Sequence, residues 1–245
     1  MRFQDRVAIV TGGAGGIGLA TARRLAREGA RIALADIDAA ELDAAAARLK
    51  AEGCGDVLPS VCDVAREEQV RAVVDQACDR FGGLDIVVNN AGLMIFKPLA
   101  ESTGEEWKRV LDVDLLGAFY FIKHALLRMR TGGTIVNVSS IHALNTSPLV
   151  ASYAAAKAGL LSLTRSAAIE GKPKGIRVNA VLPGAIDTPM LWENPNVKSG
   201  AERIDPADVG SPEDVAAAIA FLASDDAAFV QGAAILVDGG RLSKL

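Results

Sequence analysis

The chain has 245 residues, half of them hydrophobic, and a formal net charge of −4 at pH 7. Because its charges are of mixed sign, nucleic acid is not expected as the main partner. No apolar run approaches the roughly 18 residues that a transmembrane helix requires, so no membrane partner is expected. A chain of this length can bury a large core as one unit, and we expect residues 1–245 to form a single α/β domain.

The N-terminus and the cysteines indicate a cytoplasmic protein. The first six residues lead directly into an apolar run, which leaves no room for a signal peptide. Cys54, Cys62 and Cys78 are odd in number and lack C-x-x-C spacing. We therefore expect reduced thiols and no metal site.

Seven short apolar runs alternate with helical patterns. The runs predict strands at 6–10, 31–35, 57–61, 84–89, 133–138, 176–182 and 233–237. Helices are expected near 17–28, 39–52, 66–81, 103–130, 152–171 and 212–224. This alternation predicts right-handed crossovers and a parallel sheet covered on both faces. The one long irregular stretch, about 189–210, is expected to be a substrate lid or disordered.

A glycine-rich turn separates the first predicted strand from the first helix. Gly12, Gly16 and Gly18 have G-x-x-x-G-x-G spacing, not the commoner G-x-G-x-x-G. In a strand–turn–helix unit, backbone N–H groups at the helix N-terminus face a pyrophosphate, and side chains would block its approach. Since glycine-rich turns open many α/β units, the assignment depends on the residues that follow.

Asp36 ends the second predicted strand, 18 residues beyond Gly18. A carboxylate at this place accepts hydrogen bonds from an adenosine ribose and repels a 2′-phosphate. No Lys or Arg counters its charge, because Gly15 precedes the second motif glycine and Ile37 follows the acid. The alternative is that Asp36 caps the next helix or is a solvated residue at the end of a strand. The pattern favours NAD(H) over NADP(H).

Three residues in the middle of the chain predict proton transfer. Tyr153 and Lys157 are four residues apart in an alanine-rich segment, so both project from one helix face. A phenol is a poor base at neutral pH, but an ammonium and a positively charged nicotinamide would lower the pKa of Tyr153. Tyr153 would then take the hydroxyl proton in alcohol oxidation and return it in ketone reduction. Ser140, after the strand at 133–138, can polarise the substrate oxygen.

Over nearly its whole length the chain resembles a short-chain dehydrogenase/reductase of the single-domain type. The matching segments, in family order, are Thr11–Gly18, Cys62–Val64, Asn89–Gly92, Ser140 with Tyr153–Lys157, Pro183–Thr188 and Val237–Gly240. The resemblance implies a Rossmann-type, doubly wound domain with a seven-stranded parallel sheet in the order 3-2-1-4-5-6-7. It also implies a homotetramer, built on the helices at 103–130 and 152–171 and completed by the C-terminal segment.

The resemblance further implies a cofactor site and a reaction. The positions expected to bind NAD are Gly12, Gly16, Ile17, Gly18, Asp36, Ile37, Asp63, Val64, Asn90, Ala91, Gly92, Tyr153, Lys157, Pro183, Gly184, Ile186 and Thr188. Lys157 would hold the nicotinamide ribose hydroxyls in addition to acting on Tyr153. The implied activity is reversible hydride transfer between NAD(H) and a secondary alcohol or ketone.

One catalytic position departs from the family pattern. The long helix usually carries an asparagine before a leucine, whereas this chain has Asp114 before Leu115. In the family, that asparagine helps to hold a water that relays protons to the lysine. Aspartate keeps the main-chain carbonyl and the shape, but it adds a charge and loses two donors. It is either a tolerated near-isostere or an ion-pair partner of Lys157 that weakens the effect of the lysine on Tyr153.

The expected substrate pocket is mostly apolar. In hydroxybutyrate-type relatives, a histidine at the place of His142 helps to bind a carboxylate, together with a lysine and a glutamine. Here Val150 replaces the lysine and Leu93 and Met94 lie near the place of the glutamine, so the carboxylate set is incomplete. The other expected lining residues are Met94, Ile95, Leu149, Val150, Ala185, Met190, Leu191 and Trp192. This lining suits an alicyclic, aryl or steroid-like alcohol better than a small acid.

Three alternatives remain open. His142 and Asn145 can orient a sugar or polyol. Asp114 is the one feature that favours a weakly catalytic, dinucleotide-binding protein. An epimerase or dehydratase of the sibling families would share Tyr153 and Lys157, but those chains usually add a C-terminal substrate domain.

Overall fold

Seven parallel strands form one sheet in the computed structural model, which describes residues 1–200 and 202–244. The strand order is β3-β2-β1-β4-β5-β6-β7, as the family resemblance implies. The strands are β1 (Val7–Thr11), β2 (Arg31–Asp36), β3 (Val57–Val61), β4 (Ile86–Asn89), β5 (Thr134–Val138), β6 (Arg177–Pro183) and β7 (Ala234–Val237). The predicted Rossmann-type sheet is confirmed, with strand ends within two residues of those expected.

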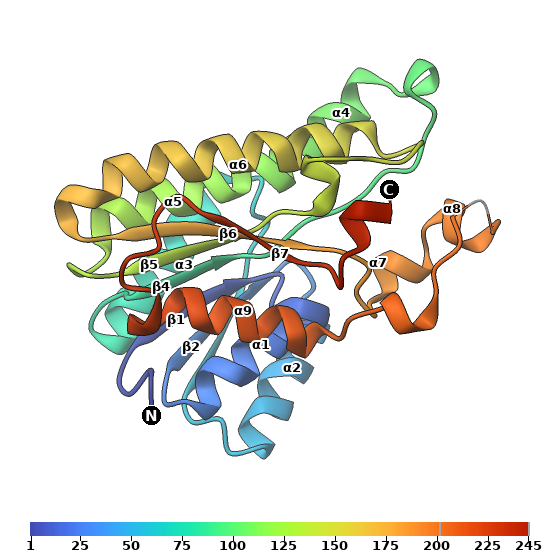
Figure 1. Ribbon diagram of the computed structural model, residues 1–245. Coiled ribbons are helices and arrows are strands. Elements are labelled where there is room, and N and C mark those ends of the chain that lie inside the picture. The colour runs from blue at the N-terminus through green and yellow to red at the C-terminus, as the bar shows by residue number, and fades with distance from the viewer. Residues whose placement is uncertain (201, 245) are drawn as a thin grey trace.

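Helices cover both faces of the sheet (Figure 1). One face carries α1 (Gly16–Arg27), α2 (Ala39–Ala51) and α9 (Pro212–Ala223), and the other carries α3 (Glu67–Phe81), α5 (Gly117–Arg128) and α6 (Ala151–Gly171). Ala8 and Val10 of β1 belong to the first core, and Val7 and Ile9 belong to the second. Because successive side chains of a strand point to opposite faces, a strand covered on both sides is apolar at every position.

The start of α2 excludes one of the alternatives for Asp36. The side chain of Asp38 accepts hydrogen bonds from the backbone amides of Ala40 (3.0 Å) and Glu41 (3.1 Å), and it therefore caps the helix. Asp36 lies two residues earlier, at the end of β2. The alternative that Asp36 serves as the helix cap is therefore wrong.

The helix expected at 103–130 is interrupted. Its first part, α4 (Gly104–Leu111), leads into a π-helical segment, Asp112–Leu116, which in turn leads into α5. A π-helical turn holds about one residue more than an α-helical turn, and such segments are frequent at functional sites. Asp114 lies in the middle of this segment and is only 1% exposed.

The stretch at 189–210 is more regular than the sequence predicts. It contains two short helices, α7 (Pro189–Trp192) and α8 (Pro195–Lys198), and a 3-10 turn at Pro206–Asp208. Each begins with a proline, whose fixed φ suits a first helical position. Figure 1 shows α7 and α8 beside the C-terminal turn, Arg241–Lys244. The expectation of an irregular or disordered stretch is corrected, because short helices occupy part of it.

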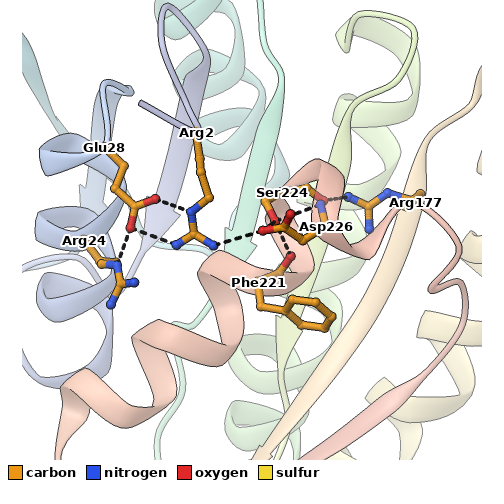
Figure 2. A network of polar contacts seen from close by, with 7 residues as sticks. All are labelled: Arg2, Arg24, Glu28, Arg177, Phe221, Ser224 and Asp226. Carbon is orange, nitrogen blue, oxygen red and sulfur yellow. Dashed lines mark hydrogen bonds and ion pairs between the residues drawn. The ribbon is translucent and has the colours of Figure 1, made fainter.

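A polar network lies at the other end of the sheet, where β6 begins (Figure 2). Arg2 donates to Glu28 at 2.8 Å and lies 3.6 Å from Asp226. Arg177 donates to the carbonyl of Ser224 at 2.9 Å. The hydrogen bond from Arg2 is the main reason why the pKa of Glu28 is lowered. Exposed ion pairs contribute about 0–1 kcal/mol each to the stability of the fold. The main effect of this network is therefore to position the N-terminus and the end of α9.

Candidate active site

A cavity of about 270 Å³ opens at the carboxyl ends of β1, β4, β5 and β6, the edge at which ligands bind in open α/β sheets. It gathers most of the predicted site residues. Its lining includes Gly12, Gly16, Ile17, Asn90, Ala91, Gly92, Met94, Ser140, His142, Tyr153, Lys157, Pro183, Gly184, Ile186 and Thr188. Within the described residues, no group of three or more His, Cys, Asp or Glu side chains is placed to hold a metal ion.

The glycine turn fits a dinucleotide pyrophosphate. Gly12 and Gly16 have φ angles of +60° and +50°, a conformation that glycine adopts without strain. A Cβ atom on Gly18 would lie 2.0 Å from the carbonyl oxygen of Gly12, so no side chain is possible there. The first turn of α1 has neither a capping side chain nor an acidic residue. Its free amides and the positive end of the helix dipole therefore favour an anion.

Asn90 holds this turn against the end of β4. Its Nδ2 donates to the carbonyl oxygens of Thr11 (3.0 Å) and Gly12 (3.1 Å). The backbone amides of Asn90 and Ala91 both donate to Thr11 Oγ1 at 2.9 Å. These four hydrogen bonds fix the end of β1 relative to the end of β4.

Asp36 lies against the opposite side of the glycine turn. Its Oδ2 accepts from the amide of Ala14 at 3.0 Å, and its Oδ1 accepts from the amides of Ile37 (2.8 Å) and Asp38 (3.3 Å). The carboxylate is thus fixed beside the turn, on the side where β2 ends. Neither Asp36 nor Ile37 lines the cavity itself.

Three further predicted cofactor residues lie outside the cavity lining: Gly18, Asp63 and Val64. Gly18 lies under the glycine turn, as described above. Asp63 accepts from the amide of Ala65 at 3.0 Å, which shapes the turn after β3. Val64 is 7% exposed and packs so closely on α5 that a Cβ on Gly117 would lie 2.8 Å from it. Val64 therefore contributes to the core whether or not a cofactor is bound.

The Ser140, Tyr153 and Lys157 side chains meet at the cavity. Tyr153 is 7% exposed and Lys157 is 3% exposed. The Lys157 Nζ lies 5.4 Å from the centre of the Tyr153 ring and donates to the carbonyl of Val138 at 3.1 Å. Ser140 Oγ accepts from the amide of His142 at 3.2 Å, which fixes the hydroxyl after β5.

Burial controls the protonation of Tyr153. Desolvation raises the pKa of the phenol, the Lys157 ammonium opposes this rise, the Asp114 carboxylate adds to it, and Ser140 opposes it weakly. The net direction is upward. The expectation of a lowered pKa for Tyr153 includes the charge of a bound nicotinamide and stays a prediction. Among the chain's own groups, desolvation of the phenolate outweighs the nearby ammonium.

Asp114 forms a buried ion pair with Lys157. The Asp114 Oδ2 lies 3.2 Å from Lys157 Nζ, and Oδ1 accepts from the amide of Leu93 at 2.8 Å. Burial alone would lower the pKa of Lys157, but Asp114 and Tyr153 together raise it. Burial raises the pKa of Asp114, and Lys157 opposes that rise. A Cβ on Gly92 would lie 2.9 Å from the Asp114 carboxylate, so the pair requires glycine there.

The substrate side of the cavity differs in part from the prediction. Met94, His142, Ala185, Met190 and Leu191 line it as expected, whereas Ile95, Leu149, Val150 and Trp192 do not. Trp192 is 45% exposed, and its Nε1 donates to Asp187 Oδ1 at 2.7 Å. Trp192 therefore stays a predicted substrate residue that does not line the cavity in this structure.

Three polar lining residues carry no signal in the sequence: Asn194, Glu202 and Arg241. Glu202 follows α8, Arg241 begins the C-terminal turn, and the two form an ion pair. They are 39 residues apart and belong to no motif. Only the packing of α7 and α8 beside the C-terminus brings them to the cavity.

The fold, the glycine turn and the buried polar cluster define a Rossmann-type oxidoreductase. Residues 12–241 match the family model described as enoyl-(acyl carrier protein) reductase, and the chain belongs to the short-chain dehydrogenase/reductase family, which binds a nicotinamide dinucleotide. Its relatives include dehydrogenases and reductases of secondary alcohols and ketones, so the chain is an oxidoreductase of that kind.

Three proteins show how similar the chain is to known sequences and structures. The chain is 46% identical to the cis-4-hydroxycyclohexanecarboxylate dehydrogenase of Sinomonas cyclohexanicum, with 97% of each chain covered. The crystal structure of levodione reductase superposes with a TM-score of 0.93 at 37% identity, with 100% of each chain covered. A blue fluorescent protein from a metagenomic library, solved in complex with NADPH, has a TM-score of 0.88 at 35% identity and covers 98% of this chain and 99% of its own.

Proposed function

We propose that this protein is an NAD-dependent secondary-alcohol dehydrogenase and ketone reductase, reversible, with an alicyclic, aryl or steroid-like substrate. The observation that carries the proposal is the convergence of Ser140, Tyr153 and Lys157 on the cavity beside the glycine turn.

Residues 1–245 act as one domain, and the segment at 189–210 is its substrate lid. The three free cysteines favour the cytoplasm, where thiols stay reduced. No helix of the described part is long and apolar enough to cross a bilayer.

The chain's own residues account for the proton transfer. When bound, the nicotinamide ring supplies the hydride acceptor or donor. Ser140 donates a hydrogen bond to the substrate oxygen and holds it near Tyr153. In oxidation the Tyr153 phenolate takes the hydroxyl proton, and in reduction the phenol donates it to the carbonyl oxygen. Lys157 favours the phenolate by its charge, and Asp114 acts as a positioning residue that offsets part of that charge.

Asp36 supports the preference for NAD. Its carboxylate is held by three backbone amides beside the glycine turn, and repulsion of a 2′-phosphate follows from its charge. Gly15 and Ile37, the neighbours that would have to supply a compensating cation, are uncharged. The remaining predicted cofactor positions, which follow β1, β3, β4 and β6 or lie on α6, would hold the dinucleotide at this edge of the sheet.

The enzyme test is reduced-nicotinamide absorbance with a panel of alcohols and ketones, comparing the native chain with Tyr153→Phe. The variant keeps the ring but loses the acid–base group, so turnover should fall by roughly 10²–10⁴ while NAD still binds. Tyr120→Phe is the matched control, because Tyr120 lies on α5 outside the cavity lining. A Tyr153→Phe enzyme that keeps most of its turnover would show that the base is misassigned.

We also propose a homotetramer. Within the described chain, Phe229 is fully exposed, Ile169 is 74% exposed on α6, and Leu127 is 67% exposed on α5. The last strand, β7, is only partly covered. These apolar surfaces suit an assembly with closed symmetry. A monomer in light scattering at micromolar concentration would contradict this proposal.

A sugar or polyol is the second candidate substrate class. It is favoured by one observation, the polar end of the cavity formed by His142, Asn194, Glu202 and Arg241. The panel distinguishes the classes, because a polyol dehydrogenase would turn over acyclic diols better than ring alcohols. Turnover of any alcohol would contradict a purely dinucleotide-binding role.

A further inference from the structure

The side chains that meet at the cavity come from two different elements. Ser140 follows β5, whereas Tyr153 and Lys157 lie on α6. Proton transfer therefore depends on the position of α6 along β5. Alanine, glycine and leucine make up most of the buried residues of α6. Because apolar contacts are not directional, they do not by themselves hold the helix at one position along the strand.

Three consecutive residues at the end of β5 form hydrogen bonds with α6. Asn137 Nδ2 donates to Thr164 Oγ1 at 2.8 Å. The carbonyl of Val138 accepts from Lys157 Nζ at 3.1 Å, and Ser139 Oγ donates to the carbonyl of Lys157 at 2.9 Å. Since hydrogen bonds weaken steeply when distance or angle changes, these contacts fix α6 along the strand.

The contact of Asn137 belongs to a longer buried chain of hydrogen bonds. Asn89 Nδ2, on β4, donates to Asn137 Oδ1 at 2.8 Å. Thr164 Oγ1 donates its proton to the carbonyl of Leu160 at 2.7 Å, so its oxygen is left to accept from Asn137. The side chains of Asn89, Asn137 and Thr164 are all buried. In such surroundings a complete network is strong, and a broken one is costly.

The same chain reaches the glycine turn. Asn90, next to Asn89, donates to the carbonyls of Thr11 and Gly12. Hydrogen bonds and one peptide link therefore connect the predicted cofactor turn with the helix that carries Tyr153.

We infer that Asn137 and Thr164 are positioning residues for proton transfer, because their hydrogen bond holds α6 at the place along β5 where Tyr153 meets Ser140. Neither residue lines the cavity. Without the Thr164 hydroxyl, the buried amide of Asn137 has no acceptor, and α6 shifts as the amide finds another. Such a shift moves Tyr153 relative to Ser140. The inference rests on the proposed function and adds two residues to it.

The first test is the kinetics of Thr164→Val, which keeps the shape of the side chain and removes its hydroxyl group. The substrate is the panel alcohol with the highest kcat/KM for the native enzyme, with NAD as cofactor. Because small misplacements of reacting groups cost up to about 10²-fold in rate, we expect kcat to fall about tenfold and KM for the alcohol to change less than about threefold. Thr164→Ser returns the hydroxyl group and should restore kcat.

The pH profile of oxidation gives a second readout. In the described chain, the titratable side chains near Tyr153 are Lys157, Asp114 and His142. The hydrogen bond from Ser140 lowers the pKa of Tyr153. A shift of α6 that weakens this bond raises the pKa of Tyr153. Oxidation needs the phenolate, so its profile should move to higher pH in the first variant and return in the second.

Thr134→Val is the matched control. Thr134 begins β5, at the other end of the strand, and its buried hydroxyl donates to the carbonyl of Leu222 at 3.5 Å. The control loses a buried hydroxyl group of the same strand but should keep kcat and the pH profile. The inference is overturned if Thr164→Val keeps both, if the control changes both equally, or if Thr164→Ser does not restore them.

A spectroscopic titration separates this inference from the proposed function. The chain has two tyrosines, so in a Tyr120→Phe background the phenolate absorbance reports Tyr153 alone. We expect Thr164→Val to raise the midpoint of this titration by about half a pH unit or more, and an unchanged midpoint would overturn the inference. If no alcohol of the panel is oxidised, the proposed function fails, and the titration still decides whether Thr164 positions Tyr153.

Discussion

The replacement Asp114→Asn tests the buried ion pair most directly. Asparagine restores the usual family residue and keeps an acceptor for the amide of Leu93, but it removes the charge beside Lys157. The Asp114 carboxylate raises the pKa of Tyr153, so its removal should lower that pKa. Oxidation needs the phenolate, and its rate at neutral pH should rise. Reduction needs the phenol, and its rate should begin to fall at a lower pH than in the native enzyme.

The magnitude follows from the geometry. Lys157 Nζ lies 3.2 Å from the Asp114 carboxylate and 5.4 Å from the centre of the Tyr153 ring, so the carboxylate is at most 8.6 Å from that centre. At an effective dielectric constant of about 20, a unit charge at that distance contributes about 2 kcal/mol. Since part of this is lost to relaxation, we expect kcat/KM for oxidation at neutral pH to rise about tenfold, the equivalent of roughly 1.4 kcal/mol.

The assay is a pair of pH profiles, one for alcohol oxidation and one for ketone reduction, for the native enzyme and the variant. Asp112→Asn is the control, because Asp112 lies in the same π-helical segment but pairs with exposed Lys108 outside the cavity. We expect both Asp114→Asn profiles to move to lower pH and the control profiles to stay in place. If the profiles of Asp114→Asn do not move, Asp114 is only a near-isostere of asparagine and the reasoning is refuted.

Three further predictions concern cofactor choice, backbone space and thiol reactivity. NAD should exceed NADP at least about tenfold in kcat/KM, and Asp36→Ala should narrow that ratio; equal use by the native enzyme would contradict the role of Asp36. In thermal or urea unfolding, Gly18→Ala should lose about 3 kcal/mol because its Cβ would strike the backbone, whereas Gly15→Ala, whose Cβ meets nothing within 4 Å, should be neutral. Burial raises the pKa of Cys62 to about 12, so alkylation of the folded protein followed by mass spectrometry should find the partly exposed Cys78 modified well before Cys62.

Much of the fold and half of the site can be predicted from local patterns. The strands of a doubly wound sheet are covered on both faces, so each reads as a continuous apolar run, and the glycines of the turn are required by backbone geometry within a few residues. The spacing of Tyr153 and Lys157 places both on one helix face by helix periodicity alone. The departure at Asp114 was also visible in the sequence.

Tertiary structure decided the rest, because it depends on groups that are distant along the chain. Desolvation by the packed core raises the pKa of Tyr153 against the effect of Lys157, and burial is not a property of local sequence. Asp114 meets Lys157 from a π-helical segment, although the helical pattern predicted one uninterrupted helix. Glu202 and Arg241 meet only because short helices after β6 pack beside the C-terminus. An ion pair between separate segments produces no periodic pattern in the sequence, because its two residues come into contact only after the chain has folded.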